Sequence, residues 1–254
     1  MNDLQFQRYQ RQIMVPEVGE SGQALLLASK VLIVGCGGLG SSVALYLASA
    51  GVGQLVVADG DCVESSNLQR QVIYREFDIG VNKAKATVNQ IKQLNSSNKV
   101  RSVESFLEDD RLNLEVMMAD VVLDCSDNFP TRQAVNKACV ESGTPLISGS
   151  AIGWVGQLMT FDFRQSKQPC YHCAVPYQDD SAGLKCSENG VIGPVVGTLG
   201  NLQALEAIKL ITQNAKLKPN VLNLFDGQSL TWQKFNISVD PSCPICSHLS
   251  TRLT

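Results

Sequence analysis

Residues 30–59 read KVLIVGCGGLGSSVALYLASAGVGQLVVAD, and this stretch decides the fold. Lys30–Val34 is a short apolar run that predicts a buried strand, and a glycine-rich turn follows it at residues 35–40. Ser41–Ala50 has the composition of a helix, and Gln54–Ala58 is a second apolar strand. Strand, turn, helix and strand within about thirty residues form the βαβ unit of a parallel sheet.

The glycine turn and the residue after the second strand predict a nucleotide site. Gly35, Gly37 and Gly40 fit the pattern G-x-G-x-x-G, and Gly38 lies inside it. Such glycines let backbone N–H groups approach a phosphate at a helix N-terminus, where the helix dipole favours an anion. Asp59 lies 19 residues beyond Gly40, where a carboxylate can accept hydrogen bonds from ribose hydroxyls. The motif alone does not choose between NAD, FAD and ATP.

The rest of the chain predicts one α/β domain over residues 1–254. We expect a helical arm at 1–28 (with the helix over 3–28), a Rossmann-like, nucleotide-binding half at 29–150 and an antiparallel half at 151–254. The further expected elements are helix Lys83–Leu94, strand Lys99–Phe106, strand Val121–Leu123, helix Thr131–Ser142, strand Pro145–Ser148, an exposed antiparallel strand Gly156–Phe163, a mobile loop 176–192, helix Pro194–Leu210 and a hairpin Asn220–Ser238.

Composition narrows the class of protein. The 254 residues are 44% hydrophobic and 18% charged, which indicates a soluble globular chain with a substantial core. The formal charge of −3 gives no reason to expect nucleic acid as a partner, since binding the phosphate backbone needs a basic face. The first twelve residues are polar, so no signal peptide is expected, and the glycine-punctuated apolar run 24–58 does not suit a membrane span. We therefore expect a cytoplasmic protein with no membrane partner.

Four of the nine cysteines have metal-ligand spacing. Cys170 and Cys173 form one Cys-x-x-Cys pair, and Cys243 and Cys246 form another. Two such pairs can hold one tetrahedral Zn²⁺ in a closed site, which is structural because it has no open position for a substrate. The alternative is two redox pairs or ordinary buried cysteines.

Charged and polar residues beyond the glycine turn favour a triphosphate over a dinucleotide. The segment Asn67 to Gln71 contains Arg70, Lys83 follows it, and Asp127-Asn128 comes after the third strand. Two cations and a carboxylate at strand ends suit ATP with Mg²⁺. Each residue taken singly is compatible with an ordinary solvated side chain.

In combination these motifs resemble the ThiF/MoeB/HesA family, whose members resemble the adenylating half of ubiquitin-activating enzymes. The resemblance covers nearly the whole chain. The segments that carry it are Arg8-Tyr9-x-Arg11-Gln12, the glycine turn, Ser66 to Gln71, Asp124-Cys-x-Asp127-Asn128, both Cys-x-x-Cys pairs and Gln203-Ala-Leu-Glu206-Ala.

The resemblance implies an enzyme that uses ATP and Mg²⁺ to adenylylate the C-terminal glycine carboxylate of a small ubiquitin-like sulfur-carrier protein ending in Gly-Gly, releasing pyrophosphate. Arg11, Arg70 and Lys83 would then stabilise the phosphate charge. Asp127 would hold Mg²⁺ or the phosphates, Asn67 would make a polar contact beside them, and Asp59 would bind the ribose. Cys186 matches a position that links covalently to the carrier in some members.

The family further implies a homodimer, because Arg11 is donated to the neighbouring subunit's site. No sulfur-transferring domain follows in the sequence, so a separate donor such as a cysteine desulfurase is expected. Residues 189–197, Leu224 to Gln228 with Trp232, and the final Cys-Pro-Ile-Cys look more like the branch that activates the thiamine carrier ThiS. The alternatives are a MoeB-type enzyme for the carrier MoaD, a HesA-like enzyme, an NAD- or FAD-linked oxidoreductase and a carrier-binding module without catalysis.

Overall fold

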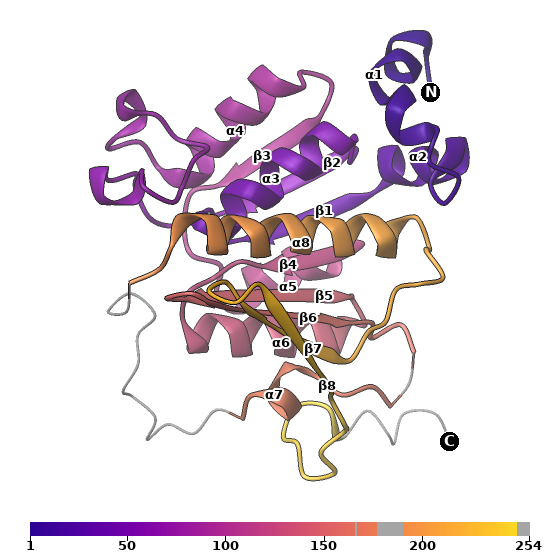
Figure 1. Cartoon of the computed structure of the whole chain (residues 1–254), viewed down its shortest axis with the longest axis vertical. Coiled ribbons are helices and arrows are strands. Elements are labelled where there is room, and N and C mark those ends of the chain that lie inside the picture. The colour runs from indigo at the N-terminus through magenta and orange to yellow at the C-terminus, as the bar shows by residue number, and fades with distance from the viewer. Residues whose placement is uncertain (166, 177–189, 248–254) are drawn as a thin grey trace.

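The computed structural model describes residues 1–165, 167–176 and 190–247, and its centre is an eight-stranded mixed sheet (Figure 1). The strand order is β3-β2-β1-β4-β5-β6-β7-β8. Neighbours from β3 to β5 are parallel, and those from β5 to β8 are antiparallel. The strands are β1 (Lys30–Val34), β2 (Gln54–Ala58), β3 (Lys99–Val103), β4 (Val121–Asp124), β5 (Leu146–Ile152), β6 (Val155–Phe161), β7 (Val221–Asp226) and β8 (Thr231–Asn236).

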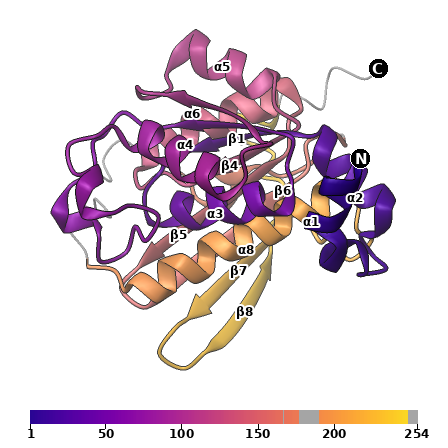
Figure 2. The ribbon, with the colours of Figure 1, turned by 90° about the horizontal axis from the view of Figure 1, so that it is seen from above.

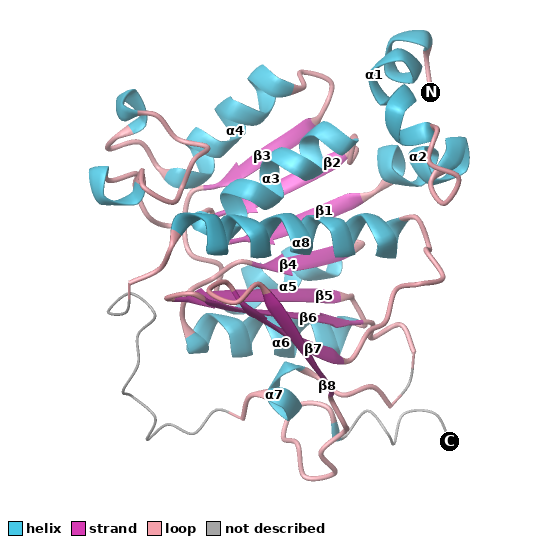
Figure 3. Ribbon diagram, in the orientation of Figure 1, coloured by secondary structure: helices cyan, strands magenta, loops and turns pink. Residues whose placement is uncertain are grey.

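Helices cover both faces of this sheet. Figure 2 shows α5 and α6 on one side and α3 and α8 on the other, and Figure 3 shows the strands running between these layers. The α-helices are α1 (Asp3–Ile13), α2 (Gly19–Ala28), α3 (Gly38–Ala50), α4 (Lys83–Leu94), α5 (Asp109–Met117), α6 (Phe129–Ser142), α7 (Tyr171–Ala174) and α8 (Gly193–Ile211). Two short 3-10 helices, Ser65–Asn67 and Glu76–Asp78, lie between β2 and α4.

Strand β1 shows why the parallel strands are uniformly apolar. Val31 and Ile33 belong to the core beneath α3, α4 and α8, whereas Leu32 and Val34 belong to the core beneath α5 and α6. Successive side chains of a strand point to opposite faces, and here both faces are buried. The sequence is therefore a continuous apolar run rather than an alternating one.

Several expected boundaries change. Helix α4 has the predicted limits, but the predicted helical arm 3–28 is two helices, with a break around Pro16. Proline lacks an N–H and disfavours helix at the residue before it, which explains the break. Helix α3 begins at Gly38, inside the glycine turn, and β3 ends at Val103 rather than at Phe106.

Two further features of the structure differ from the sequence-based expectations. Helix α5 was not predicted at all, although it forms one of the covering layers. The strand predicted as exposed over 156–163 is β6, in which Leu158 to Phe161 are all buried. Strand β6 lies inside the sheet, between β5 and β7, and is packed by α8, so its alternating pattern did not report exposure.

The predicted mobile loop 176–192 lies mostly outside the described residues. Among the helices in the described ranges, none combines the length and apolar composition needed to cross a membrane.

Candidate functional site

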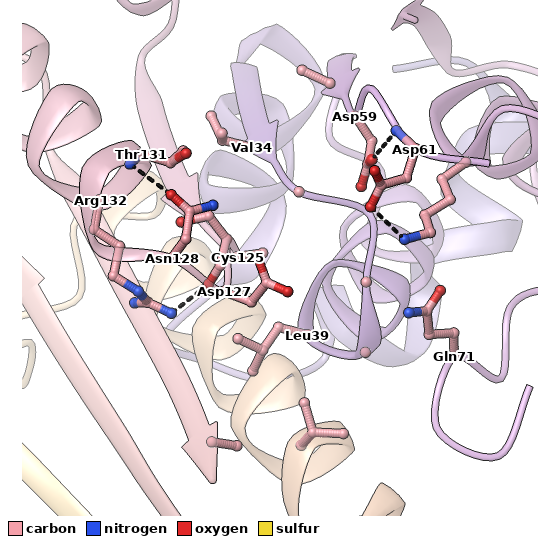
Figure 4. Close-up of a pocket in the computed structure, with 18 of the residues that line it drawn as sticks. Val34, Leu39, Asp59, Asp61, Gln71, Cys125, Asp127, Asn128, Thr131 and Arg132 are labelled. Atoms are coloured by element: carbon pink, nitrogen blue, oxygen red, sulfur yellow. Dashed lines mark hydrogen bonds and ion pairs between the residues drawn. The ribbon is translucent and has the colours of Figure 1, made fainter. Parts of the chain in front are cut away.

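A cavity of about 530 Å³ opens where β1, β2 and β4 end. The chain proceeds from β1 outward to β2 and β3, and later returns to the other side of β1 as β4. Ligands of parallel α/β sheets bind outside the carboxyl ends of the strands at such a switch point. Figure 4 shows Asp59 and Asp61 on one side of the glycine turn, and Asp127 and Asn128 on the other.

The glycine turn has its shape because side chains do not fit there. Gly35 has φ +93°, and a Cβ on it would lie 2.7 Å from the Cys125 carbonyl oxygen. A Cβ on Gly40 would lie 2.0 Å from the Gly35 carbonyl oxygen, so β1 and α3 can approach this closely only with glycine. Gly37 and Gly38 form the start of α3, and the positive end of the helix dipole therefore faces the cavity.

Asp59 is the acidic residue at the end of β2, and backbone N–H groups hold its carboxylate. Cys36 N donates to Asp59 Oδ2 at 2.7 Å, and Asp61 N donates to Asp59 Oδ1 at 2.8 Å. Burial raises the pKa of Asp59, while these two hydrogen bonds and the charge of Lys83 act in the opposite direction. The carboxylate is thus fixed at the cavity wall with its remaining acceptor capacity free for a ligand.

Lys83 brings a nearly buried positive charge to the same wall. Its side chain is 10% exposed, and its Nζ lies 2.9 Å from Asp61 Oδ2, an interaction drawn in Figure 4. The backbone N–H of Lys83 donates to the Asp61 carbonyl oxygen at 2.8 Å. Asp61 therefore holds both ends of this lysine in place, at the first residue of α4.

The opposite wall follows β4. Asn128 is the N-cap of α6, because its Oδ1 accepts a hydrogen bond from Thr131 N at 2.9 Å. Asp127 lines the cavity with an exposed carboxylate that makes no hydrogen bond or ion pair to the described residues. Arg70 enters from the crossover between β2 and α4, where its Nη1 donates to the Ser66 carbonyl oxygen at 3.1 Å. The cavity thus combines the cations Lys83 and Arg70 with carboxylates on both walls.

The structure does not bring every predicted residue to the cavity. Gly40 lies beneath the turn, and Asn67 is buried in the crossover, where its Oδ1 accepts from Glu64 N at 3.2 Å. Arg11 is exposed on α1 and does not line the cavity. Cys186 lies outside the described residues.

The cavity also contains residues that the sequence did not single out. Phe106 is 62% exposed although it is aromatic, and its ring lies against Gly60, where a Cβ would be 2.7 Å from the ring. Arg132 faces the cavity from α6 but is held by buried partners, including Asp124 Oδ2 at 3.5 Å and the Gly149 carbonyl oxygen at 2.9 Å. Of these cavity residues, Asp61 is the one with a local signal in the sequence, because it lies two residues after Asp59.

The four cysteines do not line the cavity and meet at a separate centre. Figure 1 shows α7, which begins directly after Cys170, beside the loop after β8. The four sulfur atoms all lie within 4.8 Å of one another. The Sγ–Sγ distances are 4.0 Å for Cys170–Cys173, 3.7 Å for Cys170–Cys243 and 3.4 Å for Cys173–Cys246. A tetrahedral ion with metal–sulfur bonds of about 2.3 Å requires about 3.8 Å, so the residues fit a single metal ion.

A glycine turn at the start of a helix, an acid at the end of the next strand and a cavity at the switch point define a nucleotide-binding α/β protein. The model of the ThiF family matches residues 9–245, and the chain belongs to this family.

Known proteins resemble nearly the whole chain. It is 46% identical to the sulfur carrier protein ThiS adenylyltransferase of Escherichia coli over 97% of both chains. It is 43% identical to the adenylyltransferase and sulfurtransferase MOCS3 of Dictyostelium discoideum, over 97% of this chain and 58% of that protein. Among solved structures, E. coli MccB with MccA-N7isoASN superimposes with a TM-score of 0.82 at 25% identity, over 95% of this chain and 74% of MccB.

Proposed function

We propose that this protein uses ATP to adenylylate the C-terminal glycine carboxylate of a ubiquitin-like sulfur carrier of the ThiS type, as a single adenylation domain. The observation that carries the proposal is the cavity itself, in which Asp59, the start of α3, Lys83, Arg70 and Asp127 converge. The 46% identity to a ThiS adenylyltransferase over 97% of both chains supports the choice of substrate.

Each wall of the cavity has a place in binding ATP. Asp59 accepts the ribose hydroxyls, and the N–H groups at the start of α3 receive phosphate oxygens. Phe106 presents an exposed aromatic surface at the same cavity for the adenine ring. Lys83 and Arg70 are the cations for the phosphates, and Lys83 exchanges its partner Asp61 for the nucleotide.

The reaction joins two anions. A carboxylate oxygen of the carrier attacks the α-phosphorus, the bond between the α-phosphorus and the bridging oxygen breaks, and pyrophosphate leaves. Lys83 and Arg70 reduce the repulsion between the anions and stabilise charge on the phosphorus as it is attacked. The unpaired carboxylate of Asp127 is suited to Mg²⁺, which prefers oxygen ligands and neutralises phosphate charge.

The position of Arg11 supports the proposal that it acts in the site of a second copy of the chain. Tyr9 and Gln12 attach α1 to the end of α3, where Gln12 Nε2 donates to the Ala50 carbonyl oxygen at 3.1 Å. Helix α3 has 13 residues and so separates this end from the cavity by about 20 Å. Arg11 therefore cannot enter its own site without unfolding α1, and we propose a homodimer in which each subunit supplies Arg11 to the other.

Mixed dimers test this arrangement. Arg11→Ala and Asp127→Ala are each expected to be inactive in ATP–pyrophosphate exchange. When they are unfolded and refolded together in equal amounts, half of the dimers contain one intact site, so activity should return to about a quarter of the wild type. No recovery in heterodimers verified by mass spectrometry would contradict the shared site.

The metal of the four-cysteine centre is proposed to be Zn²⁺, since four thiolates in closed tetrahedral geometry are typical of structural zinc. A covalent link between Cys186 and the activated carrier, a separate sulfur donor such as a cysteine desulfurase, and a cytoplasmic location stay predictions.

The decisive experiment is ATP–pyrophosphate exchange with purified enzyme and, separately, a thiamine-type and a molybdopterin-type carrier. Exchange with only the first carrier is expected. Exchange with only the second would keep the reaction but replace the substrate by the MoeB-type alternative, and no exchange with either would refute both carriers. Asp127→Ala should abolish exchange, whereas Asp110→Ala, an exposed acid outside the cavity on α5, should not.

A further inference from the structure

Asn136, in the middle of α6, is a buried polar side chain with one unsatisfied group. It has 0% exposure, and its Oδ1 accepts a hydrogen bond from the backbone N–H of Tyr171 at 2.9 Å. Its Nδ2 makes no hydrogen bond of ordinary geometry to the described residues. A buried amide donor without a partner is rare and requires an explanation.

The Asn136 amide lies beside a metal ligand. Tyr171 is the residue next to Cys170, so the hydrogen bond to its N–H holds the Asn136 side chain against the Cys170–Tyr171 peptide. The Asn136 side chain also interacts with the Cys170 thiol. The unsatisfied donor is therefore adjacent to an atom that becomes a strong acceptor when it is a metal-bound thiolate.

Charge explains why such a donor is needed. Four thiolates and one divalent cation carry a net charge of −2, and Cys170 and Cys243 have 0% exposure. Negative charge away from water must be offset by hydrogen-bond donors. Asp240 N supplies one to Cys173 Sγ at 3.5 Å. Asn136 Nδ2, on α6, is a second candidate donor to a ligand sulfur.

We propose that Asn136 is a positioning residue of the metal centre. Its carbonyl oxygen fixes the backbone beside Cys170, and its NH₂ group donates to the Cys170 sulfur in the metal-loaded protein. The inference rests on the metal assignment in the proposed function but not on the adenylylation reaction.

The same helix connects the metal centre to the nucleotide cavity. Asn128 caps the start of α6 at the cavity wall, and Asn136 lies two turns further along. Between them, Gln133 Nε2 donates to the Val175 carbonyl oxygen at 3.0 Å, and Gln133 Oε1 lies 3.1 Å from His172 Nδ1. Helix α6 thus fixes the first cysteine pair relative to the loop after β4.

Asn136→Asp tests the proposal with little change in size. Aspartate keeps an acceptor for the Tyr171 N–H but removes the donor and adds a negative charge beside the sulfur. Zinc affinity, measured by competition with a chromogenic chelator, should fall by about 10–100-fold. Asn98→Asp is the matched control, because it makes the same exchange at a buried amide outside the metal centre, where Asn98 Nδ2 donates to the Val52 carbonyl oxygen at 2.7 Å, and it should leave the zinc affinity unchanged. Equal affinities in Asn136→Asp and the wild type would overturn the proposal.

A measurement on the wild type decides the matter if Asn136→Asp does not fold. In protein loaded with ¹¹³Cd²⁺, the side-chain amide protons of Asn136 should show scalar coupling to the metal through the Cys170 sulfur. An Asn136 amide signal without this coupling in fully loaded protein would overturn the hydrogen bond. A wild type that binds neither Zn²⁺ nor Cd²⁺ would overturn the metal assignment itself, while ATP–pyrophosphate exchange would still test the adenylylation separately.

Discussion

Replacement of Arg132 should reveal a buried charge pair that supports the cavity wall. Arg132 and Asp124 have side-chain exposures of 5% and 1%, and Asp124 also accepts hydrogen bonds from Ser126 and Ser148. In Arg132→Met the Asp124 carboxylate keeps its charge but loses its cation, and the Ser126 and Gly149 carbonyl oxygens each lose a donor. Removing one partner of a buried ion pair costs about 3–5 kcal/mol.

Thermal unfolding provides the assay. For a domain of this size, about 2–4 °C of Tm corresponds to 1 kcal/mol, so the Tm of Arg132→Met should fall by about 6–20 °C. Lys137→Met is the control, because its pair with Glu141 on the same helix leaves both side chains exposed, at 64% and 48%. Solvent screens such a pair, and its loss should cost less than about 1 kcal/mol.

A second change separates charge from packing. Adding Asp124→Asn to Arg132→Met removes the unpaired charge, so the double variant should be more stable than Arg132→Met by about 0.5–3 kcal/mol. A Tm for Arg132→Met within about 3 °C of the wild type would refute the reasoning, because Asp124 would then not depend on its cation. A double variant less stable than Arg132→Met would show that lost packing, rather than charge, is responsible.

Three further predictions concern the two sites. Because burial raises the pKa of Asp59, its contribution to stability is fully present below the ordinary pKa of aspartate, about 3.9, and is lost as the pH rises through the raised value. The free energy of unfolding of the wild type relative to Asp59→Asn should therefore fall across that pH window, as measured by urea titrations at a series of pH values. A difference that stays constant with pH would contradict the raised pKa. Cys170→Ser should retain less metal by elemental analysis and unfold at the temperature of the chelated wild type, whereas a variant as stable as the loaded protein would show that the metal does not support the fold. Lys83→Met should lower the rate of ATP–pyrophosphate exchange by about 10²–10³-fold at saturating ATP, as the loss of one charge-stabilising donor does, and an unchanged rate would remove Lys83 from the reaction.

The parallel half of the fold could be predicted because its determinants are local. Apolar runs of strand length, glycines where a Cβ does not fit and an acid after β2 can all be recognised in segments of a few residues. Helix α5 could not be found in this way. Its sequence, DDRLNLEVM, has six exposed residues and only three buried ones, Leu112, Glu115 and Val116, so its position depends on the sheet that it covers. Strand β6 was judged exposed because burial by α8 and by two neighbouring strands is a property of the assembled sheet.

The sequence by itself determined the nucleotide turn, Asp59 as its acidic partner and the two cysteine pairs, since short spacings in the chain fix these features. Only the tertiary structure decided which charges act together. Lys83 pairs with Asp61, 22 residues earlier in the sequence, and Arg132 pairs with Asp124 and neighbouring backbone carbonyl groups. The Cys170 sulfur contacts that of Cys243, 73 residues later. Such pairs depend on strand order and helix packing, which bring distant residues within a few ångströms, and no local pattern in the chain encodes those distances.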